Sequence, residues 1–150
     1  MPTTASDTLL VLEQACRSEG LPLTAQRRAI FEVLAARTDH PTADQIWAAA
    51  RERLPDLSRT TVYRVLDTFV KLGVTTKTPH LGTSVRFDPR TERHHHAVCV
   101  VCDRVTDVES PQLDRVRLPD GKDIGFKIDD YSVHMRGICA DCRRRRRRRS

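Results

Sequence analysis

Apolar residues recur every three or four positions in four segments of the first half, and this spacing predicts four amphipathic helices. The residues on their predicted inward faces are Leu9, Leu12, Ala15 and Cys16, then Ile30, Val33 and Leu34, then Ile46, Trp47 and Ala50, and finally Val62, Val65, Leu66, Phe69 and Leu72. Thr24 and Ser58 are expected to cap the second and fourth helices, and Thr42 with Gln45 forms a capping box before the third. Gly73 is expected to end the fourth helix.

Two extended stretches follow the fourth predicted helix. Residues 74–78 and 83–87 are predicted to be strands, joined by a turn at 79–82 that contains proline and glycine. Helices followed by such a β-hairpin indicate a winged helix-turn-helix domain over residues 1–87.

A polar, turn-rich hinge at residues 88–93 marks a change of pattern. The elements predicted beyond it are strands at 96–101 and 104–108, a short helix at 113–118, and one or two strands within 124–136. A sheet this small buries little by itself, and its exposed edge could pair with a second copy. The prediction is therefore an α+β protein with an N-terminal winged helix-turn-helix domain and a small C-terminal α/β dimerisation domain over residues 88–142.

The fourth predicted helix carries a polar face suited to DNA. Its exposed positions are Arg59, Thr60, Tyr63, Arg64 and Asp67. Arginine and tyrosine near a helix N-terminus suit contacts with phosphates and base edges in the major groove. On composition alone, a solvated helix with scattered charge is the alternative. The short connection from the third helix and the hairpin that follows favour the DNA-reading interpretation.

Two Cys-x-x-Cys pairs stand in the second half, Cys99 with Cys102 and Cys139 with Cys142. They match a closed tetrahedral zinc site, because each pair donates two sulfurs from one tight turn. The chain shows neither a secretory signal nor an apolar run long enough to span a membrane, so a cytoplasmic location is expected. Thiols stay reduced there, which favours zinc over a disulfide or redox pair. Cys16 is interpreted as a small buried hydrophobe.

A second set of ligand-type residues flanks the first cysteine pair. His94, His95 and His96 stand just before it, and Asp107 stands just after it. Imidazole and carboxylate groups suit a harder, exchangeable metal. On a strand, His94 and His96 point to one face and His95 to the other. The hypothesis is one zinc that holds the fold and one exchangeable metal that carries a signal, with His95 either a bystander or part of another metal site.

Charge is distributed unevenly along the chain. The net charge of +6 comes from 26 Lys and Arg against 20 Asp and Glu, and seven of the arginines form one run, residues 143–149. The segment before residue 88 is mildly basic and the segment 88–142 is acidic, which fits a nucleic-acid-binding half joined to a metal-sensing half. Residues 143–150 are expected to form a disordered Arg-rich tail, which is either dispensable or adds salt-sensitive DNA affinity.

Several segments, in order, resemble the ferric uptake regulator (Fur) family of bacterial metal-dependent repressors. They are GLPLTAQR at residues 20–27, HPTAD at 40–44, TTVYR at 60–64 and HHHAVCVVC at 94–102, followed by the second cysteine pair. The resemblance covers nearly all of residues 8–142. Asp103 departs from it, because the family usually has glycine after the first cysteine pair. Pro119 and Gly121 also interrupt what is normally a longer helix.

The resemblance implies a homodimer that binds a double-stranded DNA operator through its winged-helix domains. The ligands it implies for a structural Zn²⁺ are Cys99, Cys102, Cys139 and Cys142. The ligands it implies for a regulatory Fe²⁺ or Mn²⁺ at the domain junction are His40, Asp88, His94, His96 and Asp107. The DNA-contacting residues it implies are Arg59, Thr60, Thr61, Tyr63 and Arg64. One ion bound to ligands from both halves would fix the angle between them.

With aspartate at position 88, the implied regulatory ligand set resembles that of the peroxide-responsive, PerR-like branch. In that branch all five regulatory ligands are His or Asp. This implies a repressor whose bound Fe²⁺ reacts with hydrogen peroxide, so that His40 or His94 is oxidised and the dimer leaves operators of oxidative-stress genes. With Mn²⁺ the site is filled but insensitive. The alternative is an iron, manganese or nickel uptake regulator that responds to metal occupancy only. Because the oxidation is sacrificial, the protein is not expected to be an enzyme.

Two other classes of zinc protein, a zinc-dependent enzyme and a zinc-ribbon module, fit less well. A nucleobase deaminase needs His-x-Glu before a Pro-Cys-x-x-Cys pair, and a metalloprotease needs His-Glu-x-x-His; the sequence contains neither motif. A zinc-ribbon interaction module would explain the cysteines. It would leave the five His and Asp positions and the winged helix unexplained.

Overall fold

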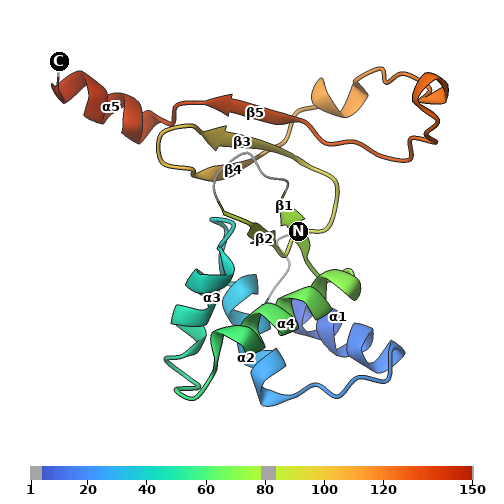
Figure 1. Cartoon of the computed structure of the whole chain (residues 1–150), viewed down its shortest axis with the longest axis vertical. Coiled ribbons are helices and arrows are strands. Elements are labelled where there is room, and N and C mark those ends of the chain that lie inside the picture. The colour runs from blue at the N-terminus through green and yellow to red at the C-terminus, as the bar shows by residue number, and fades with distance from the viewer. Residues whose placement is uncertain (1–4, 79–83, 150) are drawn as a thin grey trace. The chain divides into compact units, whose positions relative to one another are not determined.

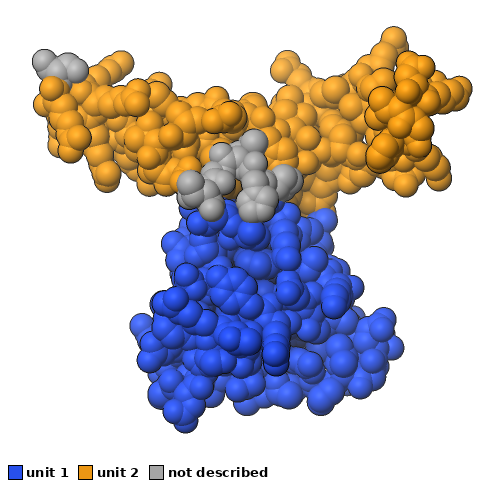
Figure 2. Space-filling model, in the orientation of Figure 1, with its two compact units in different colours: residues 1–91 blue, residues 92–150 orange. Residues whose placement is uncertain are grey.

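The computed structural model (Figure 1) describes residues 5–78 and 84–149, and the turn predicted at 79–82 lies outside them. The chain divides into two compact units, one ending at Thr91 and the other beginning at Glu92 (Figure 2). The sequence placed this boundary after residue 87. The structure extends the first unit because Asp88 ends one of its strands and pairs there with Thr76. Among the described helices, none is long and apolar enough to cross a membrane.

Four helices make up most of the first unit (Figure 1). They are α1 (Ala5–Ser18), α2 (Ala25–Ala35), α3 (Ala43–Ala50) and α4 (Arg59–Lys71). The predicted caps are confirmed, since the Thr24 and Ser58 hydroxyls each accept a hydrogen bond from an N–H of the first helical turn. Thr42 and Gln45 make both hydrogen bonds of the capping box. Gly73, just past α4, has a φ of +71°, the left-handed conformation that ends helices.

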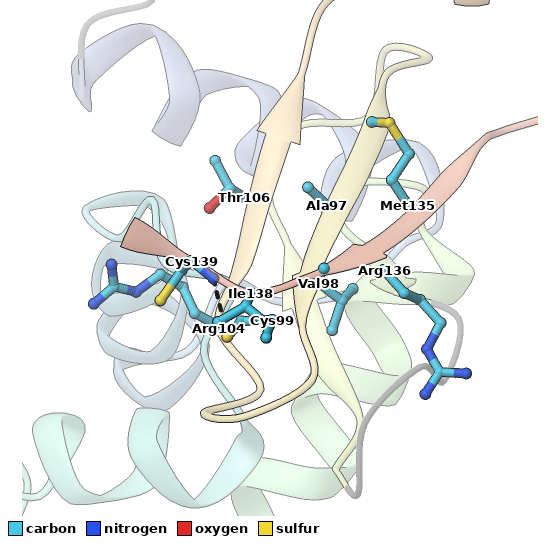
Figure 3. Close-up of a pocket in the computed structure, with 10 residues that line it drawn as sticks. Ala97, Val98, Cys99, Arg104, Thr106, Met135, Arg136, Ile138 and Cys139 are labelled. Atoms are coloured by element: carbon cyan, nitrogen blue, oxygen red, sulfur yellow. Dashed lines mark hydrogen bonds between the residues drawn. The ribbon is translucent and has the colours of Figure 1, made fainter. Parts of the chain in front are cut away.

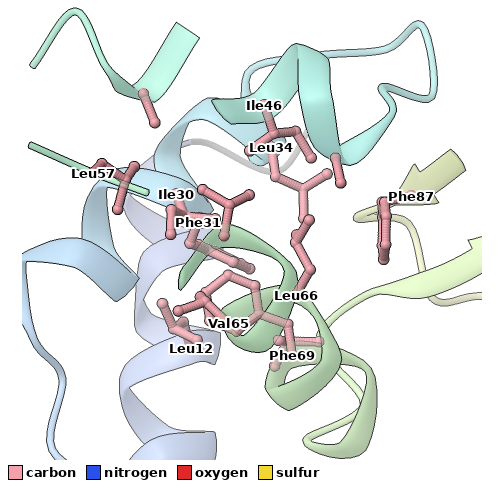
Figure 4. Packing of buried hydrophobic residues seen from close by; sticks show 14 of the residues in the cluster. Leu12, Ile30, Phe31, Leu34, Ile46, Leu57, Val65, Leu66, Phe69 and Phe87 are labelled. Atoms are coloured by element: carbon pink, nitrogen blue, oxygen red, sulfur yellow. The ribbon is translucent and has the colours of Figure 1, made fainter. Parts of the chain in front are cut away.

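The core of the first unit lies among these helices (Figure 4). Its buried side chains include the predicted Leu12, Cys16, Ile30, Leu34, Ile46, Val62, Val65, Leu66 and Phe69. Phe31 was not predicted, yet it is buried and meets the Phe69 ring edge-on with centroids 5.4 Å apart. Trp47 and Leu72 are only partly buried. The Trp47 indole N–H donates to the Leu57 carbonyl at 2.9 Å, which fixes the segment leading into α4.

Replacing Thr42 with alanine should lower the free energy of unfolding of the first unit by about 1 kcal/mol. The Thr42 hydroxyl accepts the Gln45 N–H at 3.2 Å, and the Thr42 N–H donates to the Gln45 side-chain oxygen at 3.0 Å. Alanine leaves an N–H of α3 without its acceptor. Urea denaturation measures the effect, and Thr42→Ser, which keeps the hydroxyl, is the control. Equal midpoints for both variants would contradict the role assigned to this cap.

A two-stranded antiparallel ribbon follows α4 as the predicted wing. Its strands are β1 (Thr76–Thr78) and β2 (Arg86–Asp88), both shorter than the predicted stretches. The Phe87 N–H donates to the Pro41 carbonyl at 2.9 Å and fastens the ribbon to the start of α3. The helices and the ribbon together form the winged helix-turn-helix that the sequence predicts.

The second unit is built on a three-stranded sheet with strand order β4-β3-β5. The strands are β3 (His95–Cys99), β4 (Val105–Val108) and β5 (His134–Gly137). β3 runs antiparallel to β4 and parallel to β5. The short helix predicted at 113–118 is only a 3₁₀ turn, η1 (Leu113–Arg115).

Most of the segment 124–136, predicted as one or two strands, is not a strand. A second 3₁₀ turn, η2 (Lys122–Ile124), precedes it, and regular pairing begins only at His134. The reason is the length of the neighbouring strand: β3 starts at His95 and offers no ladder partner to the earlier residues.

The arginine run is helical, which corrects the prediction of a disordered tail. α5 spans Ala140–Arg149. Its first turn is anchored, because the Arg143 N–H donates to the Cys139 carbonyl at 3.0 Å and Asp141 pairs with Arg144 one turn later. Arginine has one of the higher helix propensities, and cations at the C-terminal end suit the helix dipole. A helix that starts at the cysteines therefore continues through the run.

The second unit has a small apolar core. Among its described residues, the buried hydrophobic side chains are Val98, Cys99, Val105 and Cys142. Large apolar side chains are exposed instead, with Ile124 at 67% and Phe126 at 68%. Cores of this size rarely stabilise a domain without a metal, a crosslink or a partner. The apolar core of this unit is therefore too small to account for its stability by itself.

Candidate metal centres and nucleic-acid interface

The four cysteines of the two Cys-x-x-Cys pairs meet at one end of the second unit's sheet. Cys99 ends β3 and Cys102 lies in the turn after it, while Cys139 follows β5 and Cys142 lies in the first turn of α5. Because β3 and β5 are parallel neighbours, with Cys99 opposite Gly137, both pairs leave the sheet at the same end. All four sulfurs lie within 4.8 Å of one another.

The spacing of these sulfurs fits a zinc ion. A tetrahedral site with Zn–S bonds of about 2.3 Å places its sulfurs about 3.8 Å apart, whereas a disulfide bond is about 2.05 Å long. The Cys102 and Cys139 sulfurs are 3.8 Å apart, and all the cysteines are free thiols. Four thiolates would close the coordination sphere, which is typical of structural zinc.

Backbone N–H groups prepare two of the sulfurs to bind metal. The Cys139 N–H donates to the Cys99 sulfur at 3.3 Å (Figure 3), and this bond is the main reason that the pKa of Cys99 is lowered to about 6. The backbone N–H of Cys142 likewise lowers the pKa of Cys139. Burial raises the pKa of the Cys142 thiol to about 12, so that this thiol releases its proton as metal binds. Asp103 adopts a φ of +57°, which aspartate tolerates, and the turn forms without glycine.

Three predicted regulatory ligands converge elsewhere in the second unit. His96 on β3 stands opposite Asp107 on β4, and His94 immediately precedes β3. The Nε2 atom of His94 lies 3.2 Å from Oδ1 of Asp107, and the Nε2 atom of His96 lies 3.5 Å from the same oxygen. Both imidazoles are buried, while Asp107 is partly exposed. Two ring nitrogens thus point at one carboxylate oxygen.

The tautomer of His94 follows from its backbone neighbour. Its Nδ1 atom lies 2.7 Å from the Glu92 carbonyl, which can only accept a hydrogen bond. Nδ1 therefore donates to this carbonyl, and Nε2 is the ring nitrogen left to bind a metal on the side of Asp107. Hydrogen bonds of this kind typically orient histidine ligands in metal sites.

The other two predicted regulatory ligands meet in the first unit. Nε2 of His40 and Oδ2 of Asp88 are 3.0 Å apart, and both side chains are buried. His40 has a φ of +52°, an uncommon conformation for a residue with a Cβ that is often found at functional sites. The Arg86 guanidinium donates to the His40 carbonyl at 3.0 Å, and the Thr75 hydroxyl donates to the Asp88 carbonyl at 2.6 Å. The wing thus holds both ligands in place.

Each unit presents part of a nitrogen and oxygen donor set. The second unit offers two imidazoles and one carboxylate, the combination found in Fe²⁺ sites that keep open coordination positions. The first unit adds one imidazole and one carboxylate. Neither group includes a thiol, so the donor chemistry fits Fe²⁺ or Mn²⁺ better than Zn²⁺.

Two further histidines of the second unit have other surroundings. His95 is fully buried, with Nε2 3.0 Å from the Asp114 carboxylate and Nδ1 accepting the Val133 N–H at 3.0 Å, so it links β3 to η1 and to the segment just before β5. His134 stacks on His96 with ring centroids 5.3 Å apart and planes at 19°. Burial, followed by the neighbouring histidines, lowers the pKa of His134. Only the β3–β5 pairing brings His134 beside His96.

α4 carries the predicted DNA-reading residues. The exposed ones are Arg59, Thr60, Tyr63 and Arg64. Thr61 is partly buried, and its hydroxyl lies 2.9 Å from that of Ser58 in the helix cap. The Arg59 guanidinium lies 4.4 Å from the centre of the Trp47 ring and 3.9 Å from the Asp44 carboxylate, so it is held near the start of the helix. Thr61 is therefore more suited to shaping the helix than to reaching a base.

A hollow of about 320 Å³ lies along the sheet of the second unit (Figure 3). Ala97, Thr106 and Met135 line it from three adjacent strands. In sequence these residues alternate with His96, Asp107 and His134, so they face away from the histidine cluster. The sheet thus has one face with metal-ligand chemistry and another that is open and largely apolar.

Comparison with known proteins gives the family. The sequence matches the Ferric uptake regulator family over residues 18–136. The peroxide-responsive repressor PerR of Staphylococcus saprophyticus is 35% identical over 126 residues, which cover 84% of this chain and 85% of that protein. The peroxide operon regulator of Bacillus subtilis is 34% identical over 129 residues, covering 86% and 89%. The solved structure of the Helicobacter pylori ferric uptake regulator Fur has a TM-score of 0.78 at 21% identity and covers 93% of this chain and 94% of its own. The chain therefore belongs to the ferric uptake regulator family.

Proposed function

We propose that this protein is a metal-dependent, DNA-binding transcriptional repressor that senses hydrogen peroxide. α4 and the wing would contact operator DNA, with Arg59, Thr60, Tyr63 and Arg64 as the exposed side chains at the interface. A zinc ion on the four clustered cysteines would hold the second unit. Family membership and two relatives named for their peroxide response support this class of function.

The observation that carries the proposal is the convergence of His94 and His96 on one oxygen of Asp107. This arrangement offers three ligands on one side of an ion and leaves other positions open. Without a thiol in the set, Fe²⁺ or Mn²⁺ is the preferred occupant. An open position is what a peroxide sensor requires and what a closed structural site lacks.

We infer that one regulatory ion takes donors from both units. His40 and Asp88 belong to the first unit, and His94, His96 and Asp107 to the second. An ion bound by all five would restrict the angle between the units and favour one conformation of the dimer. In that conformation, two α4 helices would match successive major-groove half-sites.

The chemistry that Fe²⁺ supplies when bound is reductive cleavage of hydrogen peroxide. With Fe²⁺ held by these residues, one peroxide oxygen would be inserted into a ring C–H bond of His40 or His94, and the other would leave as water. His94 is well placed for this reaction because its hydrogen bond to the Glu92 carbonyl turns Nε2 toward the proposed metal. An oxidised ring is a poorer ligand, so metal affinity falls and the repressor leaves the DNA. The cysteines would keep their zinc, and the protein would be consumed rather than turned over.

Peptide mass spectrometry tests this mechanism. The protein is loaded anaerobically with Fe²⁺ and treated with a small dose of peroxide. The expected result is one added oxygen on the peptide containing His40 or His94, together with release of operator DNA. The Mn²⁺-loaded protein is the control and should remain unmodified. Unmodified histidines in the Fe²⁺ sample, with zinc intact, would leave a metal-uptake regulator as the better description.

We also propose that the second unit forms a homodimer. Its small core and its exposed Ile124, Phe126 and Met135 would be completed by a second copy covering them. The largely apolar hollow on the sheet offers further surface of the same kind. Since the proposed target is chromosomal DNA, the proposed place of action is the bacterial cytoplasm.

A further inference from the structure

We propose that α5 is a second DNA-binding element, one that holds duplex DNA through its phosphates without reading sequence. Arg143–Arg149 are seven consecutive arginines in one helix, and every one of them is exposed. This surface belongs to the second unit, whereas operator recognition is assigned to α4 in the first. Phosphate binding by α5 requires neither the peroxide chemistry nor the regulatory metal.

The charge spacing of α5 matches that of duplex DNA. A helix rises about 1.5 Å per residue, so the run carries one positive charge per 1.5 Å of its axis. Duplex DNA carries one negative charge per roughly 1.7 Å of its own axis. Successive residues turn about 100° around a helix, so the arginines lie on all sides of α5. A helix about 10–12 Å wide fits a major groove about 12 Å wide and could meet the phosphates of both strands there.

The cluster of four cysteines anchors α5 and thereby presents its arginines. Cys142 in the first turn is buried, and the Arg143 N–H donates to the Cys139 carbonyl at 3.0 Å. Asp141 pairs with Arg104 at 2.9 Å and also with Arg144. Arg145–Arg149 follow in the same helix and are exposed to solvent. Like charges three and four residues apart repel one another, and a polyanion along the helix would relieve that repulsion.

The composition of the run favours duplex DNA over other polyanions. It contains no aromatic residue on which unpaired bases could stack, as proteins that bind single strands require. It also contains no apolar residue that could enter a membrane interface. The deep, narrow major groove of duplex RNA does not admit a helix of this width. Duplex DNA is also the nucleic acid that the winged helix in the same chain is built to bind.

The test compares the full-length, zinc-loaded protein with the variant R145Q/R146Q/R147Q/R148Q/R149Q. Glutamine keeps helix propensity and removes the charge, and Arg144 stays because it pairs with Asp141. Fluorescence anisotropy measures affinity for a duplex of scrambled sequence between about 50 and 200 mM salt. Each lost phosphate contact lowers the slope of log affinity against log salt by about 0.9. The salt dependence of the glutamine variant should be shallower by about 2 to 4 in this slope. The affinity of the unmodified protein divided by that of the variant should therefore shrink roughly 16- to 250-fold as salt rises over this range.

The matched control replaces the same five arginines with lysine, which keeps the charge and should preserve the slope. Circular dichroism and zinc content show whether α5 and the cysteine site are intact in all three proteins. The proposal is overturned if the glutamine variant keeps the full slope, if the lysine variant loses it equally, or if single-stranded RNA displaces the duplex at equal phosphate concentration. Metal-dependent preference for operator over scrambled DNA is measured separately. Its absence would contradict the proposed function while leaving the role of α5 standing.

Discussion

Replacing Cys99 with serine should abolish zinc binding and unfold the second unit. Cys99 is buried at the end of β3, where it supplies one of the four clustered sulfurs. Structural zinc sites contribute roughly 10–16 kcal/mol to folding, which equals or exceeds the total stability of about 5–15 kcal/mol of a typical domain. Apart from cysteines, the buried hydrophobic side chains among the described residues of this unit are Val98 and Val105. Two valines cannot replace the contribution of the metal.

Zinc content and two-step thermal unfolding measure this effect. The first unit has its own core and should keep its transition, whereas the transition of the second unit should disappear. Cys16→Ala is the matched control, since Cys16 is equally buried but packs in the first unit's core and lies outside the sulfur cluster. That variant should retain one zinc per chain. Full zinc content and unchanged melting in Cys99→Ser would contradict the assignment.

The helices and helix caps of the first unit could be predicted from the sequence because they depend on residues close together in the chain. A threonine three residues before a glutamine makes the same two hydrogen bonds wherever a helix can start, and Thr42 with Gln45 does so here. The four helices follow from apolar spacing in the same way. Phe31 was missed although it lies three residues before Leu34 and fits the same spacing; it is one of the largest buried side chains and packs against Phe69.

The features that the sequence did not predict depend on contacts distant in the chain. Asp88 belongs to the first unit because it pairs with Thr76 across the wing. Residues 124–133 alternate enough to suggest strands, but β3 is too short to pair with them. The arginine run was expected to be disordered because like charges repel, and the anchored first turn of α5 outweighs that repulsion. The zinc site could be predicted because two Cys-x-x-Cys pairs are a ligand spacing typical of structural zinc.

Replacing Asp107 with asparagine should weaken Mn²⁺ binding at the regulatory site by at least about 100-fold, which corresponds to about 2.7 kcal/mol. Asp107 Oδ1 is the atom on which the Nε2 atoms of His94 and His96 converge. Asparagine has nearly the same shape but removes the negative charge that balances a divalent ion. Competition with a chelator of known affinity measures the loss. Metal-dependent operator binding should disappear at Mn²⁺ concentrations that saturate the unmodified protein.

Asp114→Asn is a closely matched control for Asp107→Asn. Asp114 also lies 3.0 Å from a histidine Nε2 in the same unit, but its partner is His95, which points away from the proposed ligands. If the metal requires the converging donors on β3 and β4, this variant should keep its Mn²⁺ affinity within about threefold, a difference of less than 1 kcal/mol. Zinc content should remain unchanged in both variants, because neither carboxylate belongs to the sulfur cluster. An equal loss of Mn²⁺ affinity in both variants would indicate that the regulatory metal binds on the His95 side of the sheet. Unchanged affinity in both would show that Asp107 is not a ligand.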